Sequence, residues 1–424
     1  MRPAASEPSA DASLTRAARG LGLVLAAGAS VWLLFGVALP TLRTAGFPPS
    51  QHALRGPYFG AVDLLHGDNP YRGGTERASD RLARELGVER MLTLYAPPVL
   101  LLYAPLTALG FAGAKVVAVI VNLACVPLVA WLLVRLLRAP PAAVPLTLLT
   151  VAAFQEVQRT LILGQINLLL LLALVLAMVW AEQERLVAAG VLLGLATLVK
   201  PIPAALVLAF ALRRQWRGAA AWLATLLLCG SLSVMLFGIE RNRDFLAATR
   251  AVASQPNAGP GNQSLRALQL RASGDESPPT LARDTTWWLS ALALVGASAA
   301  VVVLRPAAPL RLGLALFLAA GLLASPRSLD NYSVWLLPAL ALAFWESARA
   351  GRWWLVVLSG AAYHLSSIPA SVSREESLLP RVLPAWVFAN SQVLGLLLTW
   401  LLLMALHLAP SQQPQAQGQQ QSSQ

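Results

Sequence analysis

Polar side chains that could do chemistry stand inside or beside long apolar runs of this chain. The clearest are Gln165, Asn167 and Lys200. A lysine at the centre of a membrane helix costs about 2.5–3.5 kcal/mol by insertion scales, so such groups tend to face a wet cavity or a polar partner rather than lipid. We therefore favour a polar site inside a membrane protein.

Lys200 lies near the middle of the apolar run 186–214, and prolines follow it at once. Each half of the run has about 13 residues, or roughly 20 Å of helix, which is short of a hydrocarbon core of about 30 Å. The run predicts two short or tilted helices that meet at Lys200, on the side opposite Arg213 and Arg214. The alternative is one long kinked helix with a snorkelling lysine.

Other polar residues are predicted to reach the same outer side of the membrane. They lie in the first long loop and in 155–167, 261–264 and 325–332, and the candidates for binding are Tyr95, Gln165, Asn167, Asn262, Gln263, Arg327 and Tyr332. A cavity of cations and amides suits a lipid phosphate, with Lys200 or Arg327 at the phosphate. The alternative is that each is an ordinary loop residue or helix end.

The composition places these residues in a multi-pass α-helical membrane protein. Hydrophobic residues make up 57% of the 424 and charged residues only 12%, which no soluble class resembles. The net charge of +12 comes almost entirely from arginine, which fixes topology and binds phosphate. Nucleic acid is not an expected partner, and Cys125 and Cys229 are expected to be buried thiols.

Motifs of soluble enzymes are absent from the sequence. It has no glycine-rich phosphate loop, no paired histidines for zinc, no Gly-x-Ser-x-Gly and no Asp-x-Asp of the kind that holds a metal and a nucleotide sugar. We therefore expect no metal and no cofactor, and a lipid-linked donor rather than a nucleotide sugar.

The apolar runs predict about twelve transmembrane helices in one domain over 20–408. A cytoplasmic tail at 1–19 precedes an anchor at 21–42, and a disordered glutamine-rich tail follows at 409–424. A first outer loop, 43–112, is expected to carry interfacial helices, including one at 76–90 with an Asp80–Arg84 pair, and a second covers 238–286. The remaining spans are predicted at 113–138, 143–157, 166–181, 186–199, 202–213, 217–237, 287–304, 310–325, 331–346, 352–370 and 385–408.

The positions of the arginines predict that both termini are cytoplasmic. In this topology the short inside turns contain Arg135, Arg138, Arg185, Arg213, Arg214, Arg217, Arg305, Arg311, Arg349 and Arg352. Positive charge concentrates in short cytoplasmic loops of membrane proteins. The outer arginines lie mainly in the two long loops, where this rule has little force.

Several short motifs occur in an order that resembles glycosyltransferase family 87, bacterial membrane enzymes of the GT-C class. In chain order they are GDNPY at 67–71, YAPP at 95–98 with APL at 104–106, GQINL at 164–168, GLA at 194–196 before Lys200-Pro201, Arg214 with WR at 216–217, NQSL at 262–265, and SP at 325–326 with DNY at 330–332. The resemblance covers about 20–405.

The resemblance implies inverting transfer on the outer face without a metal, from polyprenyl-phosphate mannose or a related donor. An acidic residue of the first loop would deprotonate the acceptor hydroxyl while cations hold the leaving phosphate. Here the expected position of that acid reads Ala53, and the late Asp-His-Tyr of the family reads Asp-Asn-Tyr. The remaining candidates for the base are Asp63, Asp68, Glu156 and Asp330, each of which has an alternative as a turn residue, a solvated residue or half of an ion pair.

The sequence thus predicts an enzyme that moves a hexose, mannose above all, from a polyprenyl-phosphate donor to an acceptor glycan or glycolipid. It would act on the outer face of a bacterial plasma membrane. The alternative is a catalytically inactive relative, favoured by Ala53, or a transporter of a lipid-linked saccharide. A transporter would need internal repeats with broken helices in corresponding halves, and the break at Lys200 is the only such feature in the sequence.

Overall fold

The chain is all-helical over the residues that its structure, a computed structural model, describes. These are 20–24, 27–28, 30–43, 52–72, 76–274, 281–368 and 384–409. Within them the only β-type pairing is an isolated antiparallel bridge between Asn262 and Leu329. The tail predicted at 1–19, and all but the first residue of that predicted at 409–424, lie outside the described residues. The predicted fold class, an all-α membrane protein, is confirmed.

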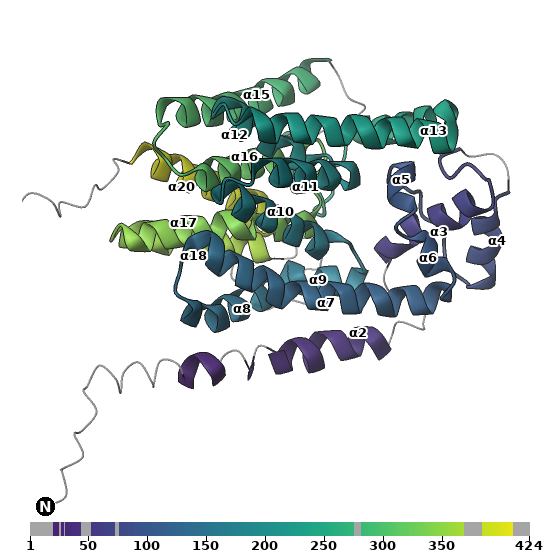
Figure 1. The fold of residues 1–424 in the computed structure, drawn as a ribbon, viewed down its shortest axis with the longest axis horizontal. Coiled ribbons are helices and arrows are strands. Elements are labelled where there is room, and N and C mark those ends of the chain that lie inside the picture. The colour runs from purple at the N-terminus through teal and green to yellow at the C-terminus, as the bar shows by residue number, and fades with distance from the viewer. Residues whose placement is uncertain are drawn as a thin grey trace, which may run out of the picture.

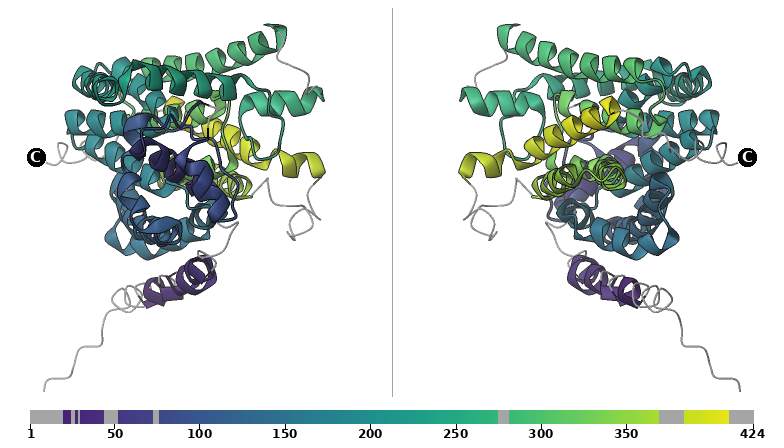
Figure 2. Two further views of the ribbon diagram at one scale, coloured as in Figure 1. Left: turned by 90° about the vertical axis from the view of Figure 1, so that its right-hand side faces the viewer. Right: turned by 90° about the vertical axis from the view of Figure 1, so that its left-hand side faces the viewer.

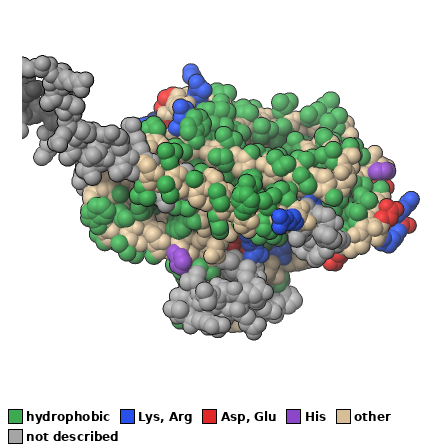
Figure 3. All heavy atoms as spheres, turned by 90° about the horizontal axis from the view of Figure 1, so that it is seen from below, with side chains coloured by type: hydrophobic (Ala, Val, Ile, Leu, Met, Phe, Trp, Pro, Cys, Tyr) green, Lys and Arg blue, Asp and Glu red, His purple; other side chains and the backbone are tan. Residues whose placement is uncertain are grey.

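The observed helices follow the predicted spans closely. They are α7 (Gly110–Leu137), α8 (Val144–Ala153), α10 (Asn167–Glu182), α11 (Leu186–Val199), α12 (Val207–Leu212), α13 (Trp216–Ser254), α15 (Leu281–Leu304), α16 (Leu310–Ala324), α17 (Leu337–Arg349), α18 (Trp353–Ser367) and α20 (Ser391–Leu408). Figure 1 shows the long helices α7, α13 and α15 lying roughly parallel. Hydrophobic side chains cover most of the face seen in Figure 3, and charged side chains lie mainly near its margins.

The number of membrane crossings is smaller if only long helices are counted. Four described helices are long and apolar enough to cross a membrane, namely Gly110–Leu137, Trp216–Ser254, Asp284–Leu304 and Ser391–Leu408. Five further apolar segments are shorter than 18 residues. Because a perpendicular span of a 30 Å core needs about 20 residues, helix length does not confirm the predicted twelve spans.

The chain breaks at Lys200 as predicted. Helix α11 ends at Val199, Lys200 is extended (φ −149°, ψ 140°), and the 3-10 helix η3 (Ile202–Leu206) leads into α12. Proline disfavours the α conformation of the residue before it, so Pro201 explains the break. The alternative of one continuous kinked helix is wrong.

Helices α11 and α13 approach each other closely through glycines four residues apart. A Cβ atom added to Gly190 would lie 2.2 Å from the carbonyl oxygen of Gly218, and one added to Gly194 would lie 2.7 Å from the Cβ of Thr225. Small residues at this spacing let two membrane helices pack backbone to backbone. The pair fixes the position of α11, and hence of the break at Lys200.

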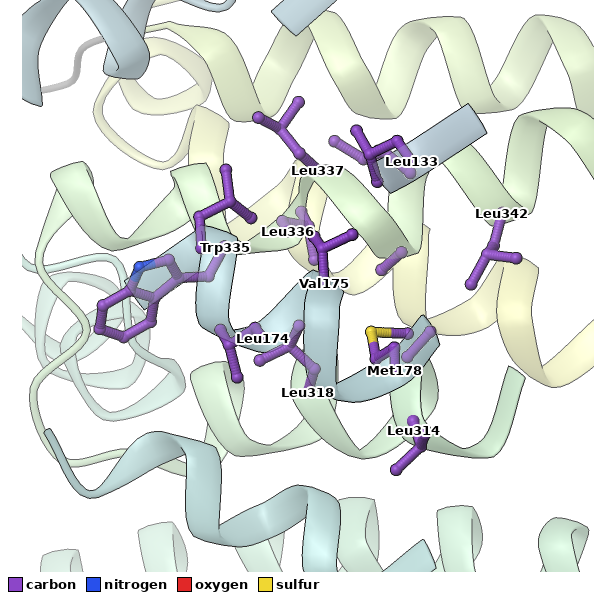
Figure 4. Close-up of a cluster of buried hydrophobic side chains, with 14 of the residues drawn as sticks. Leu133, Leu174, Val175, Met178, Leu314, Leu318, Trp335, Leu336, Leu337 and Leu342 are labelled. Carbon is purple, nitrogen blue, oxygen red and sulfur yellow. The ribbon is translucent and has the colours of Figure 1, made fainter. Parts of the chain in front are cut away.

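The main core is formed by α10, α16 and the segment that begins α17. Figure 4 shows Trp335 with Leu174, Val175 and Met178 of α10 and Leu318 of α16. All are buried, and Trp335 belongs to the 3-10 helix η4 (Asp330–Leu336) that precedes α17. This packing anchors one wall of the candidate site described below.

The first long loop forms a separate small cluster of helices. It contains α3 (His52–Leu65), α4 (Ala78–Glu85), α5 (Pro97–Leu100) and α6 (Ala104–Thr107), which gather at one end of the bundle in Figure 1 and are seen end-on in Figure 2. Their own core includes Tyr58, Phe59 and Phe111. The N-terminal segment, with η1 (Trp32–Ala38) and α2 (Leu39–Arg43), packs against α7 and α9 (Gln155–Leu163).

Two details of the predicted loops are wrong. The helix expected at 76–90 ends at Glu85, and Asp80 pairs with Arg77 (3.2 Å) and Arg90 (3.4 Å) rather than with Arg84. Arg77 precedes the helix and Arg90 follows it, so both contact Asp80 from residues outside the helix. In the second loop, α13 continues to Ser254 through a non-helical Gly238 (φ 78°, ψ 160°), and α14 (Leu265–Ser273) follows it. A further short helix, α19 (Ala385–Ala389), precedes α20.

Candidate active site

The break after α11 places the Lys200 ammonium among polar and aromatic groups from two other elements. Its Nζ donates to the side-chain oxygen of Asn167 (3.0 Å) and lies 3.8 Å from the ring centroid of Tyr332. Only 8% of Lys200 is exposed. A buried ammonium is stable only with such partners, so these side chains provide a suitable environment for a positive charge.

Asn167 connects the lysine to the segment that starts η4. The side-chain nitrogen of Asn167 donates to the carbonyl oxygen of Asn331 (3.1 Å). The indole nitrogen of Trp335 donates to the carbonyl oxygen of Asn167 (3.0 Å). Asn167 is the first residue of α10, so these two bonds attach the start of that helix to η4. The start of α10, the break at Lys200 and η4 are therefore held in one arrangement.

A pair of buried carboxylates lies on the other side of this segment. Arg159 of α9 lies 3.3 Å from the carboxylate of Asp330 and 4.0 Å from that of Glu156. Gln392, at the start of α20, donates to Glu156 (2.8 Å). The second carboxyl oxygen of Glu156 has no hydrogen-bond partner in the part of the chain that the structure describes.

Glu156 and Asp330 differ in their distance from Arg159. Burial is the main cause that raises the pKa of Glu156 to about 8; the Asp330 carboxylate also raises it, while Arg159 and the Gln392 hydrogen bond oppose the rise. Glu156 is accordingly mostly protonated at neutral pH. Asp330 has the closer contact with Arg159.

Arg327 and Tyr95 complete the cluster around Tyr332. Arg327 is near enough to Tyr332 to affect its ionisation, and its Nε is buried with no hydrogen-bond partner among the described residues. Burial raises the pKa of Tyr95 well above its usual value, and Tyr332 contributes to the rise, so the two phenols are neighbours. The Oδ1 of Asn331 is also buried and unpaired within the described structure, so the cluster offers polar atoms to a ligand.

Asn262 and Gln263 act on the site indirectly. Asn262 accepts from the backbone nitrogen of Ser328 (3.1 Å), while the Gln263 side chain donates to Ala389 (2.9 Å) and accepts from Val393 (3.0 Å). Both side chains are thus engaged in holding the loop before Asp330 against α19 and α20. Gln165 contributes its carbonyl oxygen, which accepts from Asn122 (2.8 Å), and its side chain is half-buried.

The two acidic candidates of the first loop are held within that loop. Asp63 is fully buried, lies 2.9 Å from Arg90 and accepts from the backbone nitrogen of Ser79 (3.0 Å). Asp68 accepts from the backbone nitrogen of Ala78 (2.8 Å). Ala53 lies at the start of α3. Both carboxylates thus bond to groups within the first loop.

Two residues of the candidate site, Arg159 and Gln392, were not predicted from the sequence. Arg159 lies one helical turn after Glu156, and this i,i+3 spacing in a stretch already singled out was a usable signal. Gln392 gave no local signal, because its partner lies 236 residues earlier. Among the described residues, no group of three or more His, Cys, Asp or Glu side chains could hold a metal ion.

A family model and two known proteins resemble this chain. The family model described as glycosyltransferase family 87 matches residues 93–326. A protein named alpha-(1->3)-arabinofuranosyltransferase from Mycobacterium tuberculosis (strain CDC 1551 / Oshkosh) is 33% identical over 129 residues, and its counterpart in strain H37Rv matches equally. The match covers 29% of this chain and 30% of each relative's length.

Proposed function

Because this chain belongs to glycosyltransferase family 87 and is therefore a membrane glycosyltransferase, we propose that its donor is a sugar linked to a polyprenyl phosphate. The proposed product is a glycan or glycolipid extended by one sugar. A mannose-like hexose is the first candidate for the sugar. Because the matched relatives are named arabinofuranosyltransferases, an arabinofuranosyl group is the second.

One observation carries this proposal: a carboxylate and a cation meet at the same short segment. Asp330 begins η4 beside Arg159, and two residues later Tyr332 covers the Lys200 ammonium. Transfer from a lipid phosphate needs a base for the acceptor hydroxyl and positive charge for the departing phosphate. Asp330 and Tyr332, whose ring contacts Lys200, lie within one turn of η4.

In the proposed reaction, Asp330 accepts the proton of the acceptor hydroxyl. The hydroxyl oxygen forms a bond to the anomeric carbon as the bond from that carbon to the phosphate oxygen breaks, which inverts the configuration. Lys200 and Arg327 stabilise the polyprenyl phosphate that leaves, and Arg159 holds Asp330 in position. Asp330 then releases its proton to water.

The site is proposed to face the outside of the plasma membrane. The arginine-rich turns support this orientation, because they lie at the opposite ends of the helices that begin or end at the site, such as α16 and α17. Both termini would then be cytoplasmic. Tests with a membrane-impermeant reagent on single-cysteine variants would check this topology.

A transfer assay tests the proposed activity. The full chain in lipid nanodiscs is incubated with short-chain polyprenyl-phosphate mannose or polyprenyl-phosphate arabinose and a panel of acceptor glycans, and products are detected by mass spectrometry. We expect turnover with one donor and none with nucleotide sugars. Binding of a lipid-linked sugar without turnover on any acceptor would favour a non-catalytic relative instead.

A further inference from the structure

A polar cavity lies far from the candidate active site. It has a volume of about 400 Å³ and is lined by the arginine-rich turns, with Arg138, Arg305, Arg311, Arg349 and Arg352 among its walls. Helix α16 begins at this cavity and ends just before the site loop. Its 15 residues put the two places about 22 Å apart at 1.5 Å per residue.

Two buried side chains leave nitrogen atoms without partners at this cavity. His407 is 1% exposed, and its Nδ1 donates to the carbonyl oxygen of Leu403 (3.1 Å), while its Nε2 has no partner among the described residues. Arg311 is 4% exposed and bonds Glu182 (2.6 Å) and Glu346 (2.9 Å), while its Nε is equally unpaired there. Leaving a buried polar atom unsatisfied is unfavourable, so these atoms indicate a site that a ligand completes.

The charge of the cavity indicates an anion. Five arginines line it with one acidic residue, Glu346. Glu182 adds one more negative charge next to it, through contacts with Arg311 and Arg138 (3.1 Å). The side chains of Arg349 and Arg352 make no hydrogen bond or ion pair with any other residue that the structure describes. Arginine is well suited to phosphate because its planar fork binds two oxygens at once.

The surroundings of the cavity favour a lipid as the source of the phosphate. Leu312 and Leu406 line its apolar part. Nearby, Trp353 and Trp354 start α18 with 70% and 64% of their surface exposed, and Leu304 at the end of α15 is 70% exposed. Exposed tryptophans beside apolar helix ends mark a membrane–water interface, where the acyl chains of a lipid could lie along these helices.

We propose that this cavity binds the phosphate of an anionic phospholipid headgroup at the arginine-rich end of the bundle. Arg349 and Arg352 supply charge at the mouth, while Arg311 and His407 close the inner wall. Basic pockets between membrane helices are a general means of binding anionic headgroups. The site is separate from the proposed transfer chemistry.

Native mass spectrometry of the purified full chain tests the proposal. The protein in detergent is titrated with phosphatidylglycerol, or with phosphatidylcholine of the same acyl chains, and inorganic pyrophosphate is added as a soluble competitor. We expect a preference for phosphatidylglycerol, displacement by pyrophosphate, and a loss of affinity of about tenfold or more in Arg349→Gln/Arg352→Gln. Arg349→Lys/Arg352→Lys keeps both charges and should retain most of the affinity.

The matched control changes arginines at the same end of the bundle but outside the cavity. Arg185 and Arg217 are exposed and do not line it, so Arg185→Gln/Arg217→Gln should bind within about twofold of the original chain. Equal binding of both lipids, or equal losses in the two Gln variants, would overturn the proposal. Tight binding of pyrophosphate without any preference for phosphatidylglycerol would contradict the proposal that the bound phosphate belongs to a lipid headgroup. Monodisperse elution of each variant confirms folding.

Discussion

The guanidinium of Arg159 lies 3.3 Å from the carboxylate of Asp330, which joins α9 to the first residue of η4. The same guanidinium lies 4.0 Å from Glu156. One arginine between two buried carboxylates cannot neutralise both. Glu156 has the longer contact and a pKa raised to about 8, so it is expected to be mostly neutral at neutral pH.

The first prediction concerns the pH dependence of stability. Because the pKa of Glu156 is raised from 4.5 to about 8 in the folded chain, the folded state binds the extra proton between these values. The contribution of Glu156 to stability is therefore full below about pH 4.5 and is lost as pH rises towards 8, by up to about 1.4 kcal/mol per pH unit. In Glu156→Gln this loss should vanish. Thermal unfolding of both proteins between pH 5 and 9 checks it, and parallel curves would refute the raised pKa.

The second prediction concerns Lys200. Lys200→Ala removes the cation and leaves Asn167 without its charged donor, whereas Lys200→Arg keeps the charge. A hydrogen bond to a charged group contributes about 1.5–3 kcal/mol, so the Ala variant should bind the lipid-linked donor about ten- to a hundredfold more weakly. Donor titration of turnover in both variants measures this. An Ala variant with unchanged donor affinity would remove Lys200 from the phosphate site.

The third prediction separates a scaffold from a catalytic base. Asp63→Asn removes one of the two carboxylates that contact Arg90, which keeps Asp80, and this should lower the free energy of unfolding by about 1.5–3 kcal/mol. Asp68→Asn keeps an oxygen for the Ala78 backbone nitrogen, so its cost should be about 1 kcal/mol or less. Turnover per folded molecule should be nearly unchanged in both. A folded Asp63→Asn protein without turnover would make Asp63 the base.

The fourth prediction concerns the contact between α11 and α13. Gly190→Ala would place a methyl group 2.2 Å from the Gly218 carbonyl oxygen, and such overpacking costs about 1–3 kcal/mol. Gly230→Ala, on α13, is the control because an added Cβ there meets nothing within 4 Å. The midpoint of thermal unfolding should fall only in the Gly190 variant. Equal midpoints would show that the two helices can separate without loss.

Local features of the sequence predicted much of this fold. Apolar runs gave helix positions that hold within a few residues, and Pro201 marked the break at Lys200 because a proline acts on its immediate neighbour. The wrong details arose where charged residues interrupt the pattern. The stretch after Gly238 mixes arginines and acids and was predicted as loop, yet it continues α13 to Ser254.

Residues of the site could be predicted only where their immediate sequence surroundings made them unusual. Lys200 and Asn167 were conspicuous in apolar surroundings, and the structure joins them at 3.0 Å. The pairing of Asp63 with Arg90, and of Glu156 with Gln392, depends on how distant segments pack. No spacing in the chain encodes such contacts, so the sequence alone left four carboxylates open as the base.

The most direct test of the account is the turnover of Asp330→Asn beside that of Asp68→Asn. Asparagine preserves the shape of Asp330 and its bond from the Asn331 backbone nitrogen (2.8 Å) but cannot accept the acceptor's proton. Loss of general base catalysis typically costs about 10²–10⁴-fold in rate. We expect a fall of that size in kcat for Asp330→Asn, with donor binding retained, and nearly full activity in Asp68→Asn. Full turnover in Asp330→Asn would contradict the assignment of Asp330 as the base.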